Sequence, residues 1–319
     1  MRVGIAGLGV MGKNHLRVLL SKDDVEEVVV YDSAVVDLPA GPVTLAKSFD
    51  DLISSDFDYI VVALPTAVHL QHSEILAKNG IPTLLEKPVA LNVREAVKIQ
   101  ELYDSESVLC AVGHVERFNP AISQLRAMVN EGVVGTPRLF STRRVGPYSG
   151  RIRDVGVVLD LATHDFDVIH FISGQNYESS QSILGHPLAK EHEDIFVGIG
   201  TLTSGAVVQH SVNWTTPTKV REVSVLGDRG MLVADALRVE LRLFKNGEVG
   251  SEWSAYENLR GVSEGEEIKF VVTAREPLLL EHKAMAREIT DPGSTEICLL
   301  EEAMKTMVVA ESMLNSKRI

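Results

Sequence analysis

Asp160 and His164, four positions apart, are candidates for acid–base chemistry. They interrupt the apolar segment 157–169, for which we expect a helix that places them on one face with positions 163 and 167. At this spacing a carboxylate can hydrogen-bond an imidazole and fix its tautomer, and histidine titrates near neutral pH. The pair could therefore take the proton of an alcohol. Alternatively, the two side chains could lie in a core and hydrogen-bond only each other. No further histidine or cysteine cluster accompanies it, so we assign no metal site.

A lysine follows one predicted strand, in the tripeptide Glu86-Lys87-Pro88. Ligands of open α/β sheets bind at the carboxyl ends of strands. Pro88 keeps Lys87 out of helical dihedral angles, so its side chain should leave the strand tip rather than enter a helix. An ammonium group there could bind a substrate hydroxyl and stabilise a developing alkoxide. The alternative is a solvated lysine in a turn.

The first apolar strand, Val3–Ala6, runs into the segment Gly7-Leu8-Gly9-Val10-Met11-Gly12. In a dinucleotide-binding βαβ unit the first glycine makes the tight turn. The second glycine lets the backbone approach a pyrophosphate, and the third lets helix pack on strand. A helix over 13–20 would present its N-terminus to the phosphates. These residues therefore predict a nucleotide cofactor.

Asp32 ends the next apolar run, 25–31, at about the distance from Gly12 at which an acidic side chain meets the adenosine ribose. A carboxylate there accepts hydrogen bonds from the ribose hydroxyls and repels a 2′-phosphate. We therefore predict NAD rather than NADP, although the neighbouring Ser33 would tolerate some phosphate. An ordinary turn aspartate is the alternative.

A basic cluster stands out in this acidic chain, around a turn that contains Tyr148. Its members are Arg143, Arg144, Arg151 and Arg153. Arginine forks match phosphate oxygens bidentately. We therefore expect Tyr148, Arg151 and Arg153 to contact a phosphorylated or nucleotide-linked substrate. Exposure on a loop, or pairing across an oligomer interface, is the alternative.

Three polar residues, His114, Arg117 and Asn119, occupy the junction between two predicted domains. A cleft would form there, so we expect His114 and Arg117 to bind substrate. Some of these groups could instead tie the crossover together.

The elements that would position these residues alternate between strand and helix up to residue 118. Buried strands at 59–64, 83–86 and 108–113 predict a doubly wound parallel sheet, a Rossmann domain, over 1–118. Beyond Pro120 the pattern predicts helices at 121–131 and 157–173, a strand near 138–142, strands at 195–202, 206–213, 221–226, 231–234 and 239–244, then helices at 277–290 and 299–312. The predicted fold class is α/β, with a C-terminal α+β domain, 119–319, that has an open, mostly antiparallel sheet.

Length and charge narrow the classes of function. At 319 residues the chain exceeds the usual single core. Its net charge of −13 argues against nonspecific binding to nucleic acid or an anionic membrane, because both need a basic face. The sequence has no apolar stretch near the roughly 18 residues of a membrane span and no signal-peptide core, so we expect a cytoplasmic protein. Cys110 and Cys298 match no metal or redox spacing and should be reduced core residues.

Together these motifs resemble those of the Gfo/Idh/MocA oxidoreductases, nearly from end to end. The matching segments are the Gly7/Gly9/Gly12 turn with Asp32, Leu64-Pro65-Thr66 with His69, Glu86-Lys87-Pro88-Val89-Ala90, Asp160 with His164, and Glu276-Pro277-Leu278. The resemblance implies that Lys87, Asp160 and His164 form the catalytic set. His164 would remove a hydroxyl proton while hydride passes from the same carbon to the nicotinamide, with Lys87 and Asp160 orienting and polarising the substrate.

The resemblance also implies cofactor contacts along the strand ends, at Leu64, Pro65, Thr66, His69, Glu86 and Lys87. It further implies a homodimer or homotetramer formed through the open sheet, so 119–319 should serve both substrate binding and oligomerisation.

Within the family, segments 113–120 and 154–165 look most like the UDP-N-acetylglucosamine 3-dehydrogenase branch. The arginine cluster agrees with a pyrophosphate-bearing substrate, so we expect NAD-dependent oxidation of the 3-hydroxyl of a UDP-linked acetamido sugar. The alternative is a free-sugar or inositol dehydrogenase, in which the arginines of the cluster would have a structural role. Two further alternatives are a non-catalytic cofactor-binding sensor, which would not need all three catalytic residues, and a hydrolase or lyase that uses NAD transiently. His114 departs from the family pattern, because many members carry an aromatic residue at this position on the sugar side.

Overall fold

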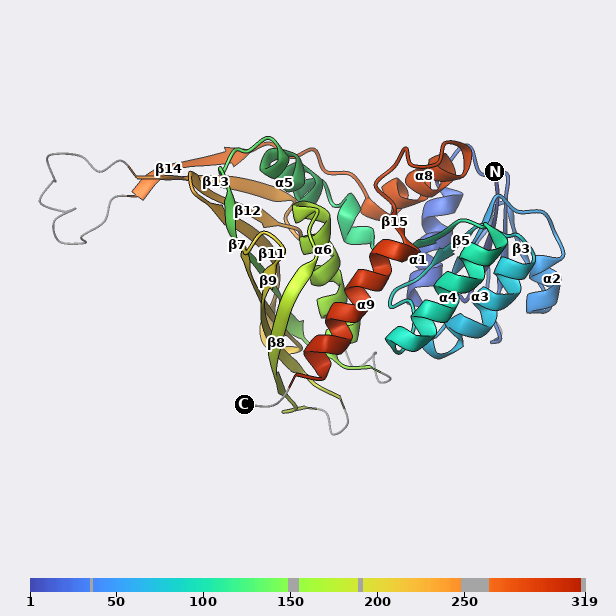
Figure 1. Cartoon of the computed structure of the whole chain (residues 1–319). Helices are drawn as coiled ribbons and strands as arrows, with labels where there is room; N and C mark the ends of the chain where they lie inside the picture. The colour runs from blue at the N-terminus through green and yellow to red at the C-terminus, as the bar shows by residue number, and fades with distance from the viewer. Residues whose placement is uncertain (35–36, 149–154, 189–191, 248–263, 317–319) are drawn as a thin grey trace, which may run out of the picture. The chain divides into compact units, whose positions relative to one another are not determined.

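The computed structural model describes residues 1–34, 37–148, 155–188, 192–247 and 264–316. The chain divides into two compact units, drawn in Figure 1. The first comprises Met1–Phe118 with Glu276–Glu311, and the second comprises Asn119–Arg275 with Ser312–Ile319.

A seven-stranded sheet forms the centre of the first unit, in the order β15-β6-β5-β4-β1-β2-β3. Its strands are β1 (Arg2–Ala6), β2 (Glu27–Tyr31), β3 (Val43–Leu45), β4 (Tyr59–Val62), β5 (Thr83–Leu85), β6 (Cys110–Val112) and β15 (Cys298–Leu299). Strands β1 to β6 pair in parallel, and β15 adds an antiparallel edge. The predicted doubly wound parallel sheet is confirmed. Its strand order reverses between β1 and β4, the place where such sheets bind ligands.

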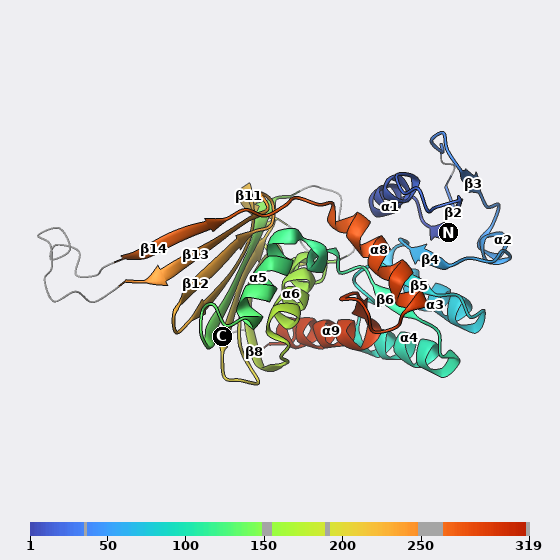
Figure 2. The ribbon, with the colours of Figure 1, turned by 90° about the horizontal axis from the view of Figure 1, so that it is seen from above.

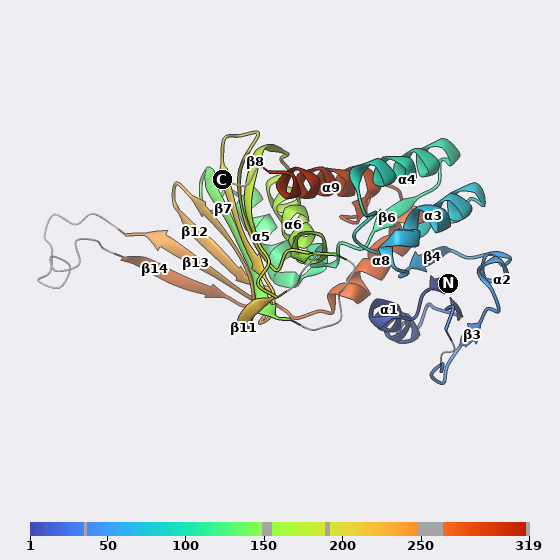
Figure 3. The same cartoon turned by 90° about the horizontal axis from the view of Figure 1, so that it is seen from below.

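Helices connect these strands and complete the first unit. They are α1 (Val10–Leu20), α2 (Phe49–Ile53), α3 (His69–Lys78), α4 (Val93–Glu106), α8 (Pro277–Thr290) and the greater part of α9 (Leu300–Leu314). Helices α3 and α4 pack side by side (Figures 1 and 3). Side chains set some helix starts: Asn92 Oδ1 accepts the Glu95 amide at 3.0 Å at the start of α4.

The predicted second domain, 119–319, is wrong in its C-terminal part, because Glu276–Glu311 belongs to the first unit. Met285 of α8 and Ile297 are buried in the same apolar cluster as Val3 and Ile5 of β1, and β15 pairs with β6. The predicted break after residue 118 coincides with the observed division.

An eight-stranded sheet forms the second unit, in the order β14-β13-β12-β11-β7-β10-β9-β8. Its strands are β7 (Pro137–Pro147), β8 (Tyr177–Gly185), β9 (Ile195–Leu202), β10 (Val207–Asn213), β11 (Thr215–Gly227), β12 (Gly230–Asp235), β13 (Glu240–Asn246) and β14 (Glu264–Phe270). All neighbours are antiparallel except β7 and β10, which are parallel. The predicted mostly antiparallel sheet is confirmed.

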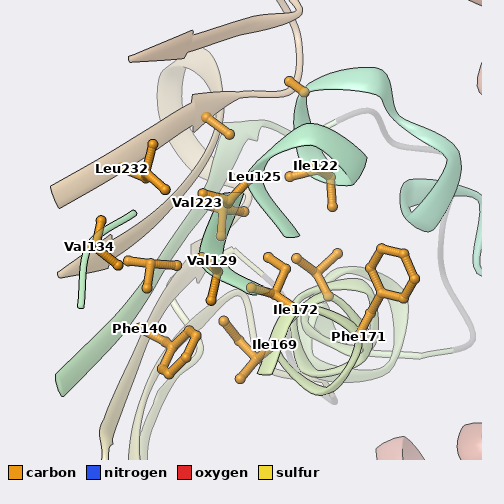
Figure 4. Close-up of a cluster of buried hydrophobic side chains, with 14 of the residues drawn as sticks. Ile122, Leu125, Val129, Val134, Phe140, Ile169, Phe171, Ile172, Val223 and Leu232 are labelled. Atoms are coloured by element: carbon orange, nitrogen blue, oxygen red, sulfur yellow. The ribbon is translucent and has the colours of Figure 1, made fainter. Parts of the chain in front are cut away.

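Helices α5 (Pro120–Asn130) and α6 (Thr163–Ser173) cover one face of this sheet (Figure 2). Apolar residues of both helices meet those of the strands in one core (Figure 4), which includes Leu125, Ile169, Phe140, Val223 and Leu232. The opposite face carries exposed apolar side chains, because alternate residues of a strand point to opposite faces. They include Ile183, Val197, Ile199, Val207 and Leu226.

Two further predictions concern the cysteines and the membrane. Cys110 and Cys298 are both buried free thiols, as expected. None of the helices in the described part of the chain has the length and apolarity needed to cross a bilayer.

Candidate active site

The three glycines after β1 each have a steric reason to lack a side chain. Gly7 has φ +95°, and a Cβ there would lie 2.6 Å from the Ala63 carbonyl oxygen. A Cβ on Gly12 would lie 1.9 Å from the Gly7 carbonyl oxygen, which keeps helix α1 close to the turn. Gly9 differs, because a Cβ there would meet no atom within 4 Å. The open space at Gly9, at the start of α1, fits the pyrophosphate of a dinucleotide.

Asp32 follows β2 and contacts the glycine turn directly. Its Oδ2 accepts the Leu8 amide at 2.6 Å, and its Oδ1 accepts the Ala34 amide at 2.8 Å. The side chain is half-buried, so lone pairs of both oxygens remain for the hydroxyls of a ribose. The carboxylate therefore lies where the sequence predicted it, next to the turn that suits a dinucleotide.

Lys87 lies at the same edge of the sheet. Register places Ala6 beside Val62, Val62 beside Leu85, and Leu85 beside Val112. The residues that follow these positions, Gly7, Lys87 and His114 among them, consequently emerge at the carboxyl ends of neighbouring strands. Lys87 is half-buried, whereas its neighbours Glu86 and Pro88 are buried.

The residues predicted to contact the cofactor after β4 differ in their exposure to solvent. Pro65 is exposed, whereas Thr66 and His69 are buried. The two ring nitrogens of His69 lie 3.0 Å from the Leu64 carbonyl oxygen and 3.1 Å from that of Val89. Burial lowers the pKa of His69, against smaller opposing contributions from these backbone hydrogen bonds. A neutral imidazole has a single N–H, so His69 donates to one of these carbonyl oxygens and only contacts the other. With 1% exposure, the ring is buried between the two loops.

Glu86 is likewise buried and engaged. Its Oε1 lies 2.8 Å from Nε2 of His15 on α1, and its Oε2 accepts the Lys87 amide at 3.2 Å. Burial raises the pKa of the carboxyl, but the hydrogen bond from His15, together with Lys87, more than offsets this, so the pKa lies below its ordinary value. Glu86 is thus held as an anion inside the first unit.

Asp160 and His164 lie in the second unit on a helix that is not regular. Residues Val158–Ala162 form a π-helical turn, and α6 begins at Thr163. Within the predicted polar face, Thr163 and Asp167 are buried, whereas Asp160 and His164 are half-buried. A π-turn bonds five residues ahead rather than four, although the Asp160 amide still bonds the Gly156 carbonyl oxygen at 3.0 Å, so the turn begins with an ordinary helical bond. Such turns often occur at functional sites.

Glu193 anchors the start of this helical segment. Its carbonyl oxygen accepts the Val157 amide and its Oε1 accepts the Val158 amide, each at 2.9 Å. A Cβ on Gly156 would lie 2.1 Å from the Glu193 carboxylate, so only glycine leaves room for it. A carboxylate at a helix N-terminus also complements the helix dipole. Sequence analysis missed Glu193 because it lies far from Asp160 in the chain.

The arginine cluster separates into different environments. Arg144 is buried, and its Nε donates to Asp165 Oδ1 at 2.7 Å. Arg143 is exposed, and Tyr148 is 44% exposed, with its ring centroid 5.4 Å from that of Trp214. Arg151 and Arg153 lie outside the described residues. A phosphate-binding role therefore does not extend to Arg144, which fixes β7 to α6 beside His164.

The junction residues are buried. Arg117 donates from Nη1 to Glu302 of α9 at 2.8 Å and is 2% exposed, and His114 is 3% exposed. Asn119 caps α5 through the Ala121 amide and donates to the Ala236 carbonyl oxygen at 2.9 Å. The contacts of Arg117 and Asn119 agree with the alternative interpretation, in which these residues stabilise the crossover rather than bind substrate.

Fold and site thus define an oxidoreductase with an NAD(P)-binding Rossmann domain, and comparison with family models gives the same class. Residues 1–114 match the model described as oxidoreductase family, NAD-binding Rossmann fold, and residues 122–233 match the GFO/IDH/MocA C-terminal domain. The chain belongs to the Gfo/Idh/MocA family.

Characterised relatives differ in substrate. The chain is 23% identical over 248 residues to UDP-N-acetylglucosamine 3-dehydrogenase of Acidithiobacillus ferrooxidans, covering 77% of this chain and 78% of that protein. It is 24% identical over 256 residues to scyllo-inositol 2-dehydrogenase (NAD(+)) of Bacillus subtilis, covering 75% of each. The solved structure of the former enzyme has a TM-score of 0.83 at 20% identity, covering 98% and 96% of the two chains, which shows a shared fold.

Proposed function

We propose that this protein oxidises a ring hydroxyl of a sugar with NAD as the acceptor. The observation that carries the proposal is Lys87 at the carboxyl edge of the sheet, alongside the open Gly9 turn and Asp32. Asp32 favours NAD, because its carboxylate suits ribose hydroxyls and repels a 2′-phosphate.

The proposed chemistry separates a proton from a hydride. When bound, NAD accepts the hydride from the carbon that carries the hydroxyl, which leaves a keto sugar and NADH. His164 takes the hydroxyl proton, and Asp160 supports the imidazolium that results. The Lys87 ammonium hydrogen-bonds the hydroxyl oxygen and stabilises its developing negative charge. Half-burial of all three side chains is consistent with these roles.

We further propose a UDP-linked acetamido sugar as the substrate, oxidised at its 3-hydroxyl. The proposal is supported by the UDP-N-acetylglucosamine 3-dehydrogenase relative and by the exposed Arg143 and Tyr148 near the end of β7. A free-sugar or inositol dehydrogenase is the second candidate. It is favoured by the burial of Arg144 against Asp165, which removes one arginine from phosphate binding, and by the scyllo-inositol 2-dehydrogenase relative.

A substrate panel tests the proposal. Purified protein with NAD is offered UDP-N-acetylglucosamine, N-acetylglucosamine, myo-inositol and scyllo-inositol, and NADH absorbance and the mass of the keto product are followed. A parallel series adds 2-oxoglutarate as a reoxidant, in case NADH stays bound. Turnover with the UDP-sugar alone supports the nucleotide-sugar assignment. Equal rates with the free sugar, or turnover with inositols alone, would overturn it and favour the second candidate.

A further inference from the structure

A chain of four buried polar side chains links α8 to the end of β5 within the first unit. Tyr59 Oη lies 2.7 Å from His282 Nδ1, His282 Nε2 lies 2.9 Å from His15 Nδ1, and His15 Nε2 lies 2.8 Å from Glu86 Oε1. Tyr59, His282 and His15 are each 0% exposed, and Glu86 is 6% exposed. The chain ends next to Lys87, whose amide donates to the other oxygen of Glu86.

The chemistry of these groups gives the chain one direction. Burial, followed by the charges of Asp24, Glu281 and Asp58, raises the pKa of Tyr59, so Tyr59 keeps its hydroxyl proton. Burial above all lowers the pKa of His282, so that ring is neutral. The Glu86 carboxylate can only accept, so His15 donates to it from Nε2. A neutral His15 then accepts at Nδ1 from His282 Nε2, and a neutral His282 accepts at Nδ1 from the Tyr59 hydroxyl. His15 then carries its proton on Nε2, facing Glu86.

We propose that Tyr59, His282 and His15 form a buried hydrogen-bonded relay that holds Glu86 ionised beside Lys87, which makes His282 a positioning residue of the lysine site. The inference deepens the proposed function and rests on it for the role of Lys87. It assigns α8, which follows the second unit in sequence, a task in the site of the first unit.

Packing around Glu86 supports the proposal independently. A Cβ on Gly113, just after β6, would lie 3.2 Å from the Glu86 carboxyl group, so the neighbouring strand leaves room for that group. Besides Lys87, the charged groups that act on the relay, among the described residues, are Lys22, Asp24, Asp58 and Glu281. Lys22 and Asp24 pair with each other at 3.5 Å. The hydrogen bonds of the relay therefore run in one line to Glu86.

The first experiment needs no substrate. Nitrogen-15 NMR of histidine-labelled protein at pH 7 reports which ring nitrogen carries the proton. We expect the Nε2–H tautomer for both His15 and His282. An Nδ1–H tautomer at either residue, or a His282 imidazolium at this pH, would overturn the relay.

A graded series of variants then measures the effect on Glu86. The carboxyl carbon-13 signal of Glu86 gives its titration midpoint in wild type, Tyr59→Phe, His282→Leu and His15→Leu. We expect upward shifts that grow toward Glu86, reaching about one pH unit or more in His15→Leu, where the direct partner is lost. His282→Gln keeps a donor for His15 and should return the midpoint toward wild type. His72→Leu is the matched control, because His72 lies in the same unit but bonds the Val68 carbonyl oxygen.

Equal midpoints across the series would contradict the proposal. If a leucine variant fails to fold, the Glu86 midpoint in Tyr59→Phe and the histidine tautomers in wild type still test the relay.

Activity separates this inference from the proposed function. In an active enzyme, we expect the acid limb of the kcat pH profile to move upward in His282→Leu, with the Kd for NAD unchanged within about twofold and recovery in His282→Gln. A shifted Glu86 midpoint with an unmoved kcat profile would remove the relay from the lysine site. If wild type oxidises nothing in the panel, the proposed function fails, while the tautomers and midpoints still test the relay.

Discussion

Asp32 uses both carboxylate oxygens on backbone amides, and this sets how its role can be tested. Asp32→Ala would remove the hydrogen-bond acceptor of the Leu8 amide as well as the negative charge. Asp32→Asn keeps an acceptor for Leu8 and removes the charge alone. We expect NAD affinity to fall roughly tenfold or more in the alanine variant, because a charged hydrogen bond contributes about 1.5–3 kcal/mol.

The asparagine variant should bind NADP better relative to NAD than wild type does, since the repulsion of a 2′-phosphate is gone. Calorimetric titration of both cofactors measures the ratio. An unchanged NAD to NADP ratio in both variants would show that Asp32 does not read the ribose.

Lys87→Ala separates binding from chemistry. We expect kcat to fall at least about 100-fold, because an ammonium that stabilises developing oxyanion charge acts chiefly in the transition state. The Kd for NAD should change little. Lys98→Ala, which alters an exposed lysine on α4, is the matched control. Turnover with the sugar substrate and fluorescence titration of NADH give the two quantities, and full activity in Lys87→Ala would remove this residue from the mechanism.

Sequence spacing predicted the residues whose contacts lie close to them in the chain. Gly7, Gly9, Gly12 and Asp32 lie within one βαβ unit, so spacing alone predicted that Asp32 lies next to the glycine turn. Arg144 was grouped with the exposed Arg143 because its partner, Asp165, is distant in sequence. His15 and Glu193 were missed for the same reason.

At the scale of elements, the helical segment of Asp160 and His164 depends on Gly156. Gly156→Ala would place a Cβ 2.1 Å from the Glu193 carboxylate and displace that cap. We expect a loss of about 1–3 kcal/mol in the free energy of unfolding and a large loss of kcat. Gly146→Ala is a matched control, because a Cβ there meets Lys219 at an ordinary 3.7 Å. Urea unfolding with activity tests this, and equal effects of the two substitutions would contradict it.

The apolar pattern predicted a helix over 157–173 but not its first turn. Both a π-turn and an α-turn bury the same apolar residues of this segment, so periodicity does not distinguish them. The distinction comes from the Glu193 contacts, which fix the amides of Val157 and Val158. Strand positions such as 195–202 were predicted well, because each alternates buried and exposed residues.

His210 of β10 makes the stability of the second unit depend on pH. It lies between Thr142 Oγ1 at 2.7 Å and Tyr177 Oη at 2.8 Å, and burial lowers its pKa to about 3. The unfolded chain binds a proton near pH 6.5 and the folded chain does not. The stability is therefore fully present above pH 6.5 and is lost as pH falls from 6.5 toward 3.

This group alone should cost about 2 kcal/mol of unfolding free energy between pH 7 and pH 5. His210→Gln should show a smaller loss over the same interval, measured by urea unfolding, whereas exposed His186→Gln should behave as wild type. The same pH dependence in His210→Gln and wild type would contradict the assignment.

At the scale of the whole molecule, the division of the chain was only half predictable. The change from alternating helices and strands after residue 118 is visible in the sequence. The return of α8 and β15 to the first unit is not, because an amphipathic helix such as 277–290 can cover any apolar surface. Its place follows from long-range contacts, the burial of Met285 with Ile5 and the pairing of Leu299 with Ala111.

The open face of the second unit's sheet carries the proposed homo-oligomer interface. Register aligns Ile183 with Val197, and Leu139 with both Val207 and Leu226, so apolar side chains continue across neighbouring strands. Ile199 is 52% exposed within this surface. A contiguous exposed apolar surface of this kind marks an interaction site. We therefore propose a dimer or tetramer formed by this face.

Ile199→Glu tests this proposal, because burying an unpaired carboxylate in the interface costs several kcal/mol. We expect light scattering after gel filtration to give a dimer or tetramer for wild type and a smaller species for the variant, with dissociation at least about 100-fold easier. Circular dichroism should be unchanged. Leu237→Glu introduces the same charge at an exposed position in the turn between β12 and β13 and should leave the assembly intact. A monomeric wild type, or an Ile199→Glu variant of unaltered mass, would show that this sheet face does not join copies of the chain.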